Sequence, residues 1–129
     1  MARPRTGRPT DLELEILKAL WERGPSTVKE VREALSDRRP MSYTFVLKML
    51  QIMTGKGLVA CDKRQRAHIY RPRETRKTVV GRLTGDLLNR VFDGSASQLV
   101  LHALEHKRAR PTELAEIRRL IEEVERRRR

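Results

Sequence analysis

The sequence predicts a mainly α protein: a winged helix-turn-helix, made of three helices and a small antiparallel β-hairpin wing, followed by a three-helix C-terminal dimerisation region. Three observations lead to this fold class. The stretch 42–54 has the apolar spacing of an amphipathic helix and is followed by glycines, which often end helices. Two short strand-like runs flank the basic stretch 63–66, as in a β-hairpin. Beyond Pro72 the apolar residues recur only at helical spacing.

The 129 residues are enough for one domain or two small ones, and the charge is divided unevenly between them. Residues 1–73 contain 16 basic and 8 acidic residues, whereas residues 74–129 contain 13 and 9. Residues 1–9 are basic, rich in Pro and Gly, and without an apolar period. We therefore expect a flexible basic arm at 1–9, a winged-helix DNA-binding domain at 10–73 and a helical dimerisation domain at 74–129.

The whole chain is strongly basic, with 29 Lys and Arg against 17 Asp and Glu, a formal net charge of +12 and a pI near 11.0. Such an excess favours polyanions as partners, with DNA, RNA and membrane surfaces as the candidates. No apolar run approaches the roughly 20 residues of a membrane span, and the start of the chain has no signal-peptide core. We therefore expect a cytoplasmic protein. The single cysteine, Cys61, excludes an intramolecular disulfide and fits a small apolar strand residue.

The first helix is expected to begin at Thr10, which forms a capping box with Glu13: the hydroxyl and the carboxylate each accept a hydrogen bond from a free amide. It should extend to about Arg23, because Gly24 and Pro25 then end it. Its apolar residues fall on one face, which we expect to lie in the core: Leu12, Ile16, Leu17, Leu20 and Trp21.

The second helix is expected to begin at another capping box, formed by Thr27 and Glu30, and to run to about Ser36. The residues expected to point inward are Val28, Val31, Ala34 and Leu35. Ser26 and Thr27, just before this helix, are candidates for a short first strand.

The stretch 42–54 is the expected recognition helix, with Ser42 as its N-cap. Its core face consists of Val46, Leu50 and Met53. Tyr43 lies at the edge of that face, so packing and DNA contact both remain open for it. The opposite face offers polar side chains to a major groove: Thr44, Lys48 and Gln51. In the preceding turn, Arg38 and Arg39 are expected near a backbone phosphate.

The part after Pro72 should form three helices, from Glu74 to Phe92, from Ser95 with a third capping box, and from about Thr112. Each has an apolar stripe that some fifty residues cannot bury on their own, so we expect an obligate homodimer interface. The residues assigned to that interface are Leu83, Leu87, Val91, Leu99, Leu114, Ile117, Leu120, Ile121 and Val124. The final residues 126–129 are expected to form a solvated basic tail.

The sequence offers no clear catalytic or metal site. His102 and His106 are one helical turn apart, which suits two metal ligands, but no cysteine cluster or further histidine completes a site. No nucleophile has a base at a recognisable spacing, and no Gly-rich phosphate loop or pair of acidic residues marks a cleft. We therefore expect neither an enzyme nor a cofactor.

Five stretches together resemble a known family. They are Leu14-Glu-Ile-Leu-Lys-Ala-Leu-Trp21, Gly24-Pro-Ser-Thr-Val-Lys-Glu-Val31, Ser42-Tyr-Thr44 with Gly55-Lys-Gly-Leu-Val59, Arg66-Ala-His-Ile-Tyr-Arg-Pro72, and Phe92-Asp-Gly-Ser95 with Leu99-Val100. In order and spacing they resemble the penicillinase-repressor family of winged-helix transcriptional regulators (BlaI/MecI/CopY type), over about residues 10–121. The resemblance implies a homodimeric repressor that binds an inverted-repeat operator and pairs through its C-terminal helices. It also implies DNA contacts by Ser42, Tyr43, Thr44, Phe45 and Lys48 on the recognition helix, and by Lys63, Arg64 and Arg66 at the wing.

The chain departs from two features found within this family. Some members are cut by a membrane-bound sensor protease at an Asn-Phe bond between the dimerising helices, and the corresponding pair here is Ser95-Ala96. A sensor protease is therefore a possible partner only if it cuts another bond. Copper-responsive members have a C-terminal cysteine cluster, which this sequence lacks, and this argues against direct copper sensing.

Two other classes of function stay open on the sequence alone. A basic architectural or RNA-binding module would bind nucleic-acid backbones without reading their sequence. A helical adaptor would instead bind an acidic protein surface with its basic half. Competition with random DNA distinguishes the first alternative from a sequence-specific repressor, and failure to shift any DNA at low salt favours the second.

Overall fold

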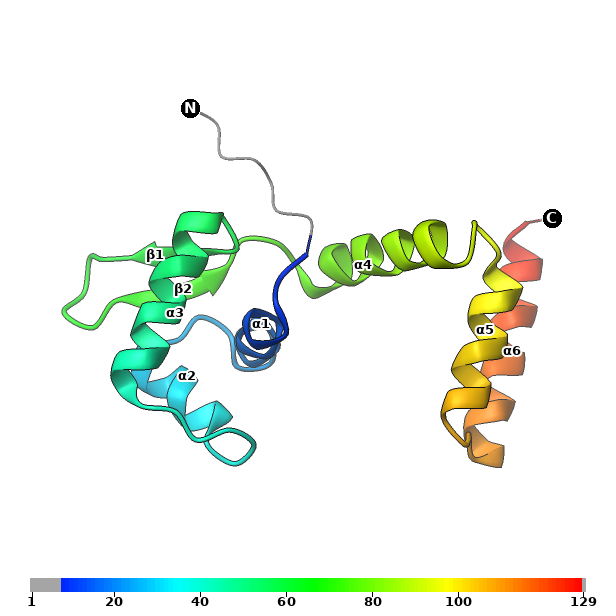
Figure 1. Cartoon of the computed structure of the whole chain (residues 1–129), viewed down its shortest axis with the longest axis horizontal. Helices are drawn as coiled ribbons and strands as arrows, with labels where there is room; N and C mark the ends of the chain where they lie inside the picture. Colours follow the sequence, from blue (N-terminus) through cyan, green and yellow to red (C-terminus); the bar gives the residue numbers. More distant parts are fainter. Residues whose placement is uncertain (1–7, 129) are drawn as a thin grey trace. The chain divides into compact units, whose positions relative to one another are not determined.

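The computed structural model describes residues 8–128, which form six helices and two strands (Figure 1). In chain order these are α1 (Asp11–Arg23), α2 (Val28–Leu35), α3 (Tyr43–Lys56), β1 (Val59–Asp62), β2 (Ile69–Pro72), α4 (Arg76–Val91), α5 (Ala96–His106) and α6 (Pro111–Arg127). The predicted fold class, three helices and a hairpin followed by helices alone, is confirmed. Of the expected basic arm at 1–9, residues 1–7 lie outside the described part of the chain.

The chain divides into two compact units, and the division falls between Leu83 and Thr84, inside α4. We call the part up to Leu83 the N-terminal unit and the part from Thr84 the C-terminal unit. The domain boundary expected at residue 73 lies in the loop before α4, ten residues ahead of this division, and the functional domains stay a prediction.

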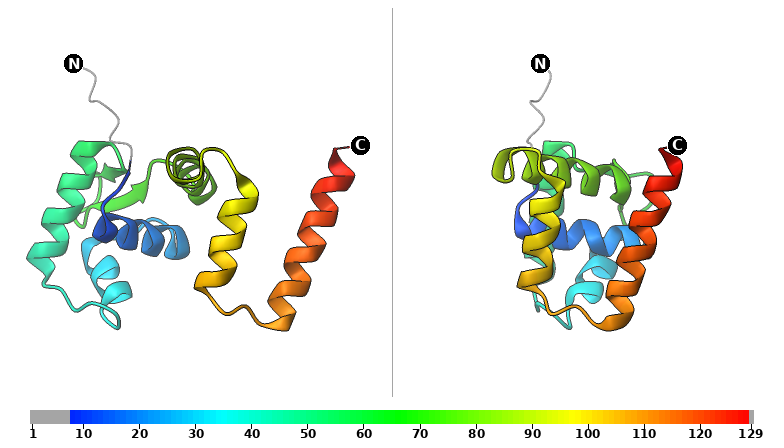
Figure 2. Two further views of the ribbon diagram at one scale, coloured as in Figure 1. Left: turned by 45° about the vertical axis from the view of Figure 1, so that its right-hand side comes forward. Right: turned by 90° about the vertical axis from the view of Figure 1, so that its right-hand side faces the viewer.

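The N-terminal unit is built around one apolar core, which α1, α2, α3 and the hairpin share. Figure 2 shows α3 at the edge of this unit, with α1 and α2 on one side of it. The buried cluster contains Ile16, Leu17, Leu20, Val28, Val31, Leu35, Val46, Leu50, Met53, Val59 and Tyr70. Leu12 and Trp21 pack against it while partly exposed, so the predicted core face of α1 is confirmed. Ala34 was expected to point inward and is exposed, because it lies at the margin of the stripe of α2.

The helix ends follow the local chemistry of the sequence. Both capping boxes are formed: the Thr10 amide donates to Glu13 at 2.9 Å, and the Thr27 amide donates to Glu30 at 2.9 Å. Gly57, with φ of 82°, adopts the left-handed conformation that ends α3, and its amide donates to the carbonyls of the last turn. The recognition helix therefore runs to Lys56, two residues beyond the predicted end.

A buried ion pair that the sequence analysis missed fixes the end of α3 against α1. The side chain of Glu13 is only 2% exposed, and its carboxylate accepts from Lys56 Nζ at 2.7 Å. Burial alone would raise the pKa of Glu13, but the hydrogen bonds from Lys56 and Thr10 together with the Lys56 charge outweigh burial and lower it. One carboxylate thus caps α1 and holds the C-terminal turn of the recognition helix.

The wing is a two-stranded antiparallel sheet in which β1 pairs with β2, with Val59 opposite Pro72 and Cys61 opposite Tyr70. The predicted short first strand is present as an isolated bridge between Ser26 and Tyr70, with backbone hydrogen bonds of 2.9 and 2.8 Å. Burial and the neighbouring Cys61 thiol raise the pKa of Tyr70 to about 12, so this phenol stays neutral in the core.

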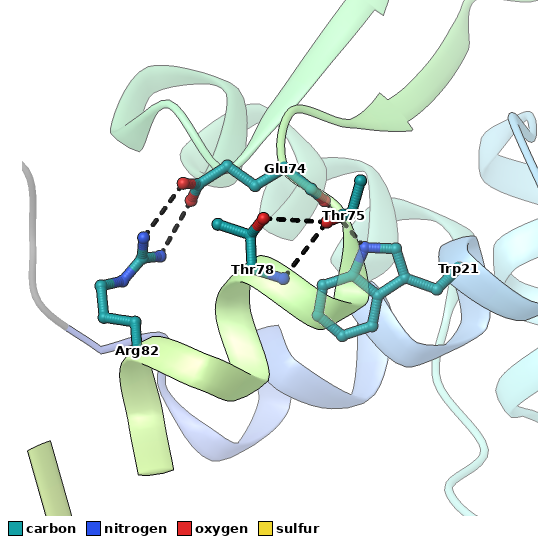
Figure 3. Close-up of polar contacts among 5 residues, drawn as sticks. All are labelled: Trp21, Glu74, Thr75, Thr78 and Arg82. Carbon is teal, nitrogen blue, oxygen red and sulfur yellow. Dashed lines mark hydrogen bonds and ion pairs between the residues drawn. The ribbon is translucent and has the colours of Figure 1, made fainter. Parts of the chain in front are cut away.

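One hydrogen bond joins the segment just before α4 to α1, and local polar contacts hold the first turns of α4 (Figure 3). The indole of Trp21 donates from Nε1 to the Glu74 carbonyl at 3.0 Å. The Thr75 hydroxyl accepts from the Thr78 amide at 3.2 Å, and Arg82 donates to both carboxylate oxygens of Glu74 at 2.8 and 3.0 Å. Val79 in the same turns is buried. The start of α4 therefore belongs structurally with the winged helix.

The C-terminal unit contains the second half of α4, α5 and α6, and it is built differently. Neither α5 nor α6 has a buried residue, and within the described chain these two helices are not closely packed on each other. A turn at Asp93 and Gly94, both with positive φ, separates α4 from α5. The Ser95 hydroxyl caps α5 by accepting from the Gln98 amide at 3.2 Å.

Three predicted features of this part need correction. The helix expected at 74–92 spans Arg76–Val91, because Thr75 supplies the first side-chain acceptor. The third predicted capping box is only half formed. Ser95 caps α5, but its own amide donates to the Phe92 carbonyl at 2.8 Å and not to the Gln98 side chain. The solvated tail was expected to begin at residue 126, but α6 continues through Arg127.

Candidate nucleic-acid interface

The outer face of α3 presents the polar side chains that the sequence analysis selected. Thr44, Lys48 and Gln51 are all exposed, on the side opposite the buried Val46 and Leu50. Within residues 8–128, the Lys48 ammonium forms no ion pair with a carboxylate. An exposed cation between a hydroxyl and an amide suits both phosphate oxygens and the acceptor atoms of base edges.

The N-terminal turn of α3 combines a fixed backbone with exposed aromatic rings. The hydroxyl of Ser42 accepts from the Phe45 amide at 3.1 Å, which makes Ser42 the N-cap as predicted. Tyr43 is 49% exposed and Phe45 is 41% exposed. The choice left open for Tyr43 is therefore decided in favour of a surface position.

The tip of the wing is basic and exposed at Lys63, Arg64 and Arg66. The Arg64 guanidinium folds back on the Asp62 carboxylate, with nitrogen–oxygen distances of 2.7 and 3.0 Å. Its side-chain and backbone hydrogen bonds hold the pKa of Asp62 well below the usual range. Asp62 thus offsets part of the Arg64 charge, and Lys63 and Arg66 supply the less compensated cations of the tip.

Arg38 and Arg39 lie in the segment between α2 and α3, where the sequence placed them. Arg38 is largely exposed, and its Nη1 lies 3.6 Å from a carboxylate oxygen of Glu15 on α1. A hydrogen bond from Lys18, followed by the charges of Lys18, Arg38 and Arg39, lowers the pKa of Glu15 despite a small opposing effect of burial. Both arginines remain accessible to a polyanion.

A hollow of about 870 Å³ connects these elements between α2, α3 and the wing. It is lined by Thr27, Val28, Lys29, Tyr43, Leu47, Gln51, Thr54, Gly55, Cys61, Lys63, Arg66, Ala67, His68 and Tyr70. Lys29 and His68 were not among the predicted site residues. Local sequence gives no signal for Lys29, because only the tertiary fold brings the start of α2 beside the wing, whereas His68 follows Arg66 by two residues on the wing itself.

The residues predicted for dimerisation lie mainly on exposed helix surfaces. On α4, Leu87 and Val91 are 44% and 62% exposed. On α6, a hollow of about 390 Å³ is lined by Ile117, Leu120, Ile121, Val124, Glu125 and Arg128. Leu83, Leu99, Leu114 and Ile117 are partly buried. Leu120, Ile121 and Val124 thus lie next to each other on α6 as an exposed apolar stripe.

Other kinds of site are not formed by residues 8–128. No three histidine, cysteine or acidic side chains of that part come together in a way that could hold a metal ion. The ring of His102 instead lies against Phe92, with centroids 5.5 Å apart. None of the described helices combines the length and the apolar character needed to cross a membrane.

Comparison with known proteins gives consistent matches. Residues 9–123 match the family described as penicillinase repressor. A Mycobacterium tuberculosis protein called transcriptional regulator BlaI is 38% identical over 117 residues, which cover 89% of this chain and 83% of that protein. A Bacillus licheniformis penicillinase repressor is 27% identical over 114 residues, covering 88% and 89%. The solution structure of monomeric B. licheniformis BlaI with the blaP half-operator matches with a TM-score of 0.47 and 27% identity, over 54% of this chain and 85% of that one.

Proposed function

Because this chain belongs to the penicillinase-repressor family, a family of transcriptional repressors and not of enzymes, we propose that it acts as a homodimer on an inverted-repeat DNA operator. The observation that carries the proposal is the exposed polar face of α3, which is held against α1 at its C-terminal end and flanked by the basic wing. In this proposal the protein works on the nucleoid, in the bacterial cytoplasm.

The recognition helix enters the major groove with Thr44, Lys48 and Gln51 toward the base edges. Its N-terminal turn is fixed by Ser42, and its C-terminal turn by the contact between Lys56 and Glu13. A helix that is capped at its start and held to its own domain at its end keeps its side chains in one register on the duplex, which sequence-specific readout requires. Tyr43 and Phe45 extend the same surface.

The basic side chains around α3 bind phosphates and set the register of the helix. Lys63, Arg64 and Arg66 on the wing, and Arg38 and Arg39 before α3, are exposed cations on two sides of it. Contacts of this kind supply most of the affinity and its salt dependence but do not distinguish bases. Lys29, which lines the same hollow as Lys63 and Arg66, joins this group.

Homodimerisation is proposed because the C-terminal unit lacks a core of its own. Leu120, Ile121 and Val124 are 45% to 53% exposed, and the apolar residues of α6 follow the spacing of a helix seam. A contiguous exposed apolar surface on a charged chain indicates a protein interface. A symmetric dimer would bury both copies of this surface and present two recognition helices to successive major grooves.

The two alternative functions differ from this proposal in what they need from α3. A sequence-indifferent nucleic-acid binder needs the cations alone, and an adaptor needs only an acidic partner. Neither gives a role to the ordered polar face of α3 beside the wing. The homodimeric operator-binding protein uses both surfaces, and for this reason we prefer it.

The experiment that tests the proposal is a competition assay at fixed salt. A labelled fragment from the promoter of the protein's own gene, containing an inverted repeat, is mixed with protein and with excess random duplex. A specific repressor retains the labelled fragment, because its affinity for a specific site typically exceeds its affinity for non-specific DNA by a factor of at least about a thousand. If excess random duplex displaces the labelled fragment as readily as an excess of the same unlabelled fragment does, the proposal is overturned.

Substitution of Lys48→Ala should weaken operator binding while leaving the dimer intact. Loss of a base or phosphate contact of this kind costs about 1–3 kcal/mol, or roughly 5-fold to 100-fold in affinity. Lys77→Ala is the matched control, because Lys77 is an exposed lysine on α4, outside α3 and the wing. Gel-shift titration measures the affinity and light scattering the assembly; dissociation of the Lys48 variant into monomers would show that this residue does not face DNA.

Relief of repression by proteolysis is proposed only for a bond other than the family's Asn-Phe pair. In the resemblance drawn from the sequence, that pair corresponds to Ser95 and Ala96, which are the N-cap and first residue of α5. The turn before them, with Asp93 and Gly94 exposed, is the accessible segment between α4 and α5. A sensor protease would act there.

A further inference from the structure

We propose that Phe45 makes the repressor sensitive to thymine, by packing its ring on the 5-methyl group of a thymine in the major groove. This inference rests on the proposed function, since it names a base feature that the same helix reads. It goes beyond that function because it assigns a chemical preference to one exposed side chain.

The starting observation is that α3 exposes large apolar side chains in a unit that otherwise buries them. Among residues 8–83, the exposed large hydrophobic residues are Tyr43, Phe45, Ile52 and Val80, and three of these four lie on α3. The core behind them is complete, since Val46, Leu50 and Met53 are fully buried. The Phe45 ring is therefore not needed to fill the fold, and its exposed area is available to a partner.

The charges around Phe45 indicate what that partner is. Lys48 lies one turn further along α3, and Arg38 and Arg39 are in the segment just before it. A second copy of this basic unit would be repelled, whereas the partner must combine negative charge with a small apolar group. The major groove of DNA offers both, because phosphates line it and the thymine methyl group is its apolar feature.

Position on the helix distinguishes Phe45 from the other two residues. Phe45 is in the first turn of α3, and residues near the start of a recognition helix contact base edges in helix-turn-helix proteins. Ile52 is two turns further along. Tyr43 lies about 160° away from Phe45 around the helix axis and lines the hollow beside the wing. Phe45 is thus the apolar residue placed for base contact next to Lys48.

A uracil scan tests the proposal. The full-length protein first selects its preferred site from random-sequence duplexes, and each thymine of that site is then replaced, one at a time, by deoxyuridine. This change removes only the 5-methyl group and keeps every hydrogen-bonding atom. Wild-type protein, Phe45→Ala and Ile52→Ala are titrated against the whole set, with thermal unfolding of each variant as the check on folding.

We expect at least one thymine in each half-site at which deoxyuridine weakens wild-type binding about fourfold, the effect of one buried methyl group. Phe45→Ala should bind the thymine and deoxyuridine sites equally, whereas Ile52→Ala should keep the wild-type preference. Phe45→Leu retains an apolar side chain and should keep part of the preference for thymine over deoxyuridine. The test therefore remains decisive if the alanine variant is unstable.

Two results have different consequences. If wild-type protein selects a site but binds every deoxyuridine duplex like the parent, or if Phe45→Ala keeps the preference, the role of Phe45 is refuted and the proposed function stands. If no site is selected at all, the proposed function itself fails before the scan begins.

Discussion

In the N-terminal unit eleven side chains form one buried cluster, whereas in the C-terminal unit α5 and α6 bury none and leave Leu120 and Ile121 half exposed. Side-chain caps occur in both parts: serine or threonine caps α1, α2 and α3 in the first and α5 in the second, while α6 begins at Arg110 without such a cap. Good helix ends therefore do not distinguish a part that folds on its own core from one that needs a partner. The distribution of buried apolar area distinguishes these two parts.

A charge placed on the exposed stripe of α6 tests most strongly whether this part of the chain needs a partner. Ile121→Glu should reduce dimer affinity by a hundredfold or more, because an unpaired carboxylate in an apolar interface costs about 3 kcal/mol or more. Operator affinity should fall with it. Ala115→Glu adds the same carboxylate to the opposite side of α6 and should remain dimeric. Analytical ultracentrifugation measures the dimer affinity of both variants. Unchanged sedimentation of Ile121→Glu would place the interface elsewhere.

A substitution in the N-terminal core should have a large effect of another kind. Leu50 is fully buried in α3, so Leu50→Ala should lower the free energy of unfolding of this unit by about 2–5 kcal/mol through lost contacts and a cavity. Because the core is complete within one chain, this loss should not depend on protein concentration. Denaturant unfolding at several concentrations measures it; a concentration-dependent loss would mean that this unit also needs its partner.

The buried ion pair offers a smaller effect with a defined pH dependence. Glu13→Gln should cost about 1–2 kcal/mol, less than a fully buried pair because the Lys56 side chain is 30% exposed. Since folding lowers the pKa of Glu13, its contribution is present above the unfolded value near 4.3 and disappears as the pH falls through the lower folded value. Thermal unfolding of both proteins between pH 7 and about pH 2 checks this. A difference that grows in acid would contradict the assignment.

The smallest effect concerns α4, where the two units meet in sequence. A Cβ added to Gly85 has nothing within 4 Å, and the same holds for Gly81. Gly85→Ala should therefore stabilise α4 by roughly 0.5–1 kcal/mol through helix propensity alone. Circular dichroism during thermal unfolding measures the change. Destabilisation that appears only in the dimer would show that a helix of the second copy approaches α4 at this glycine.

Local patterns predicted most of the N-terminal unit and much less of its long-range contacts. Capping boxes at Thr10 and Thr27 located two helix starts to the residue, because the caps involve neighbours only. The pair between Glu13 and Lys56 spans 43 residues, and the hydrogen bond from Trp21 to Glu74 spans 53. No spacing rule indicates such contacts, since they arise only once the elements pack.

For the candidate interface, too, the sequence predicted which residues of α3 are exposed but not the contacts that depend on the tertiary fold. The helical period alone placed Thr44, Lys48 and Gln51 on the exposed face of α3, because burial in one helix follows its period. The exposure of Tyr43 depended on how far the core stripe extends around the helix, which the period leaves undetermined. Lys29 lies near the wing cations only through the tertiary fold, and the partial compensation of Arg64 by Asp62 required side-chain geometry.

The most direct test of the account is the mass of the protein in solution and of its complex with an inverted-repeat duplex. Light scattering should give about twice the 15.1 kDa of one chain at micromolar concentration, and two chains per duplex in the complex. A mass of 15.1 kDa without DNA, together with independent binding of single chains to half-sites, would contradict the claim that the C-terminal unit completes its core in a homodimer.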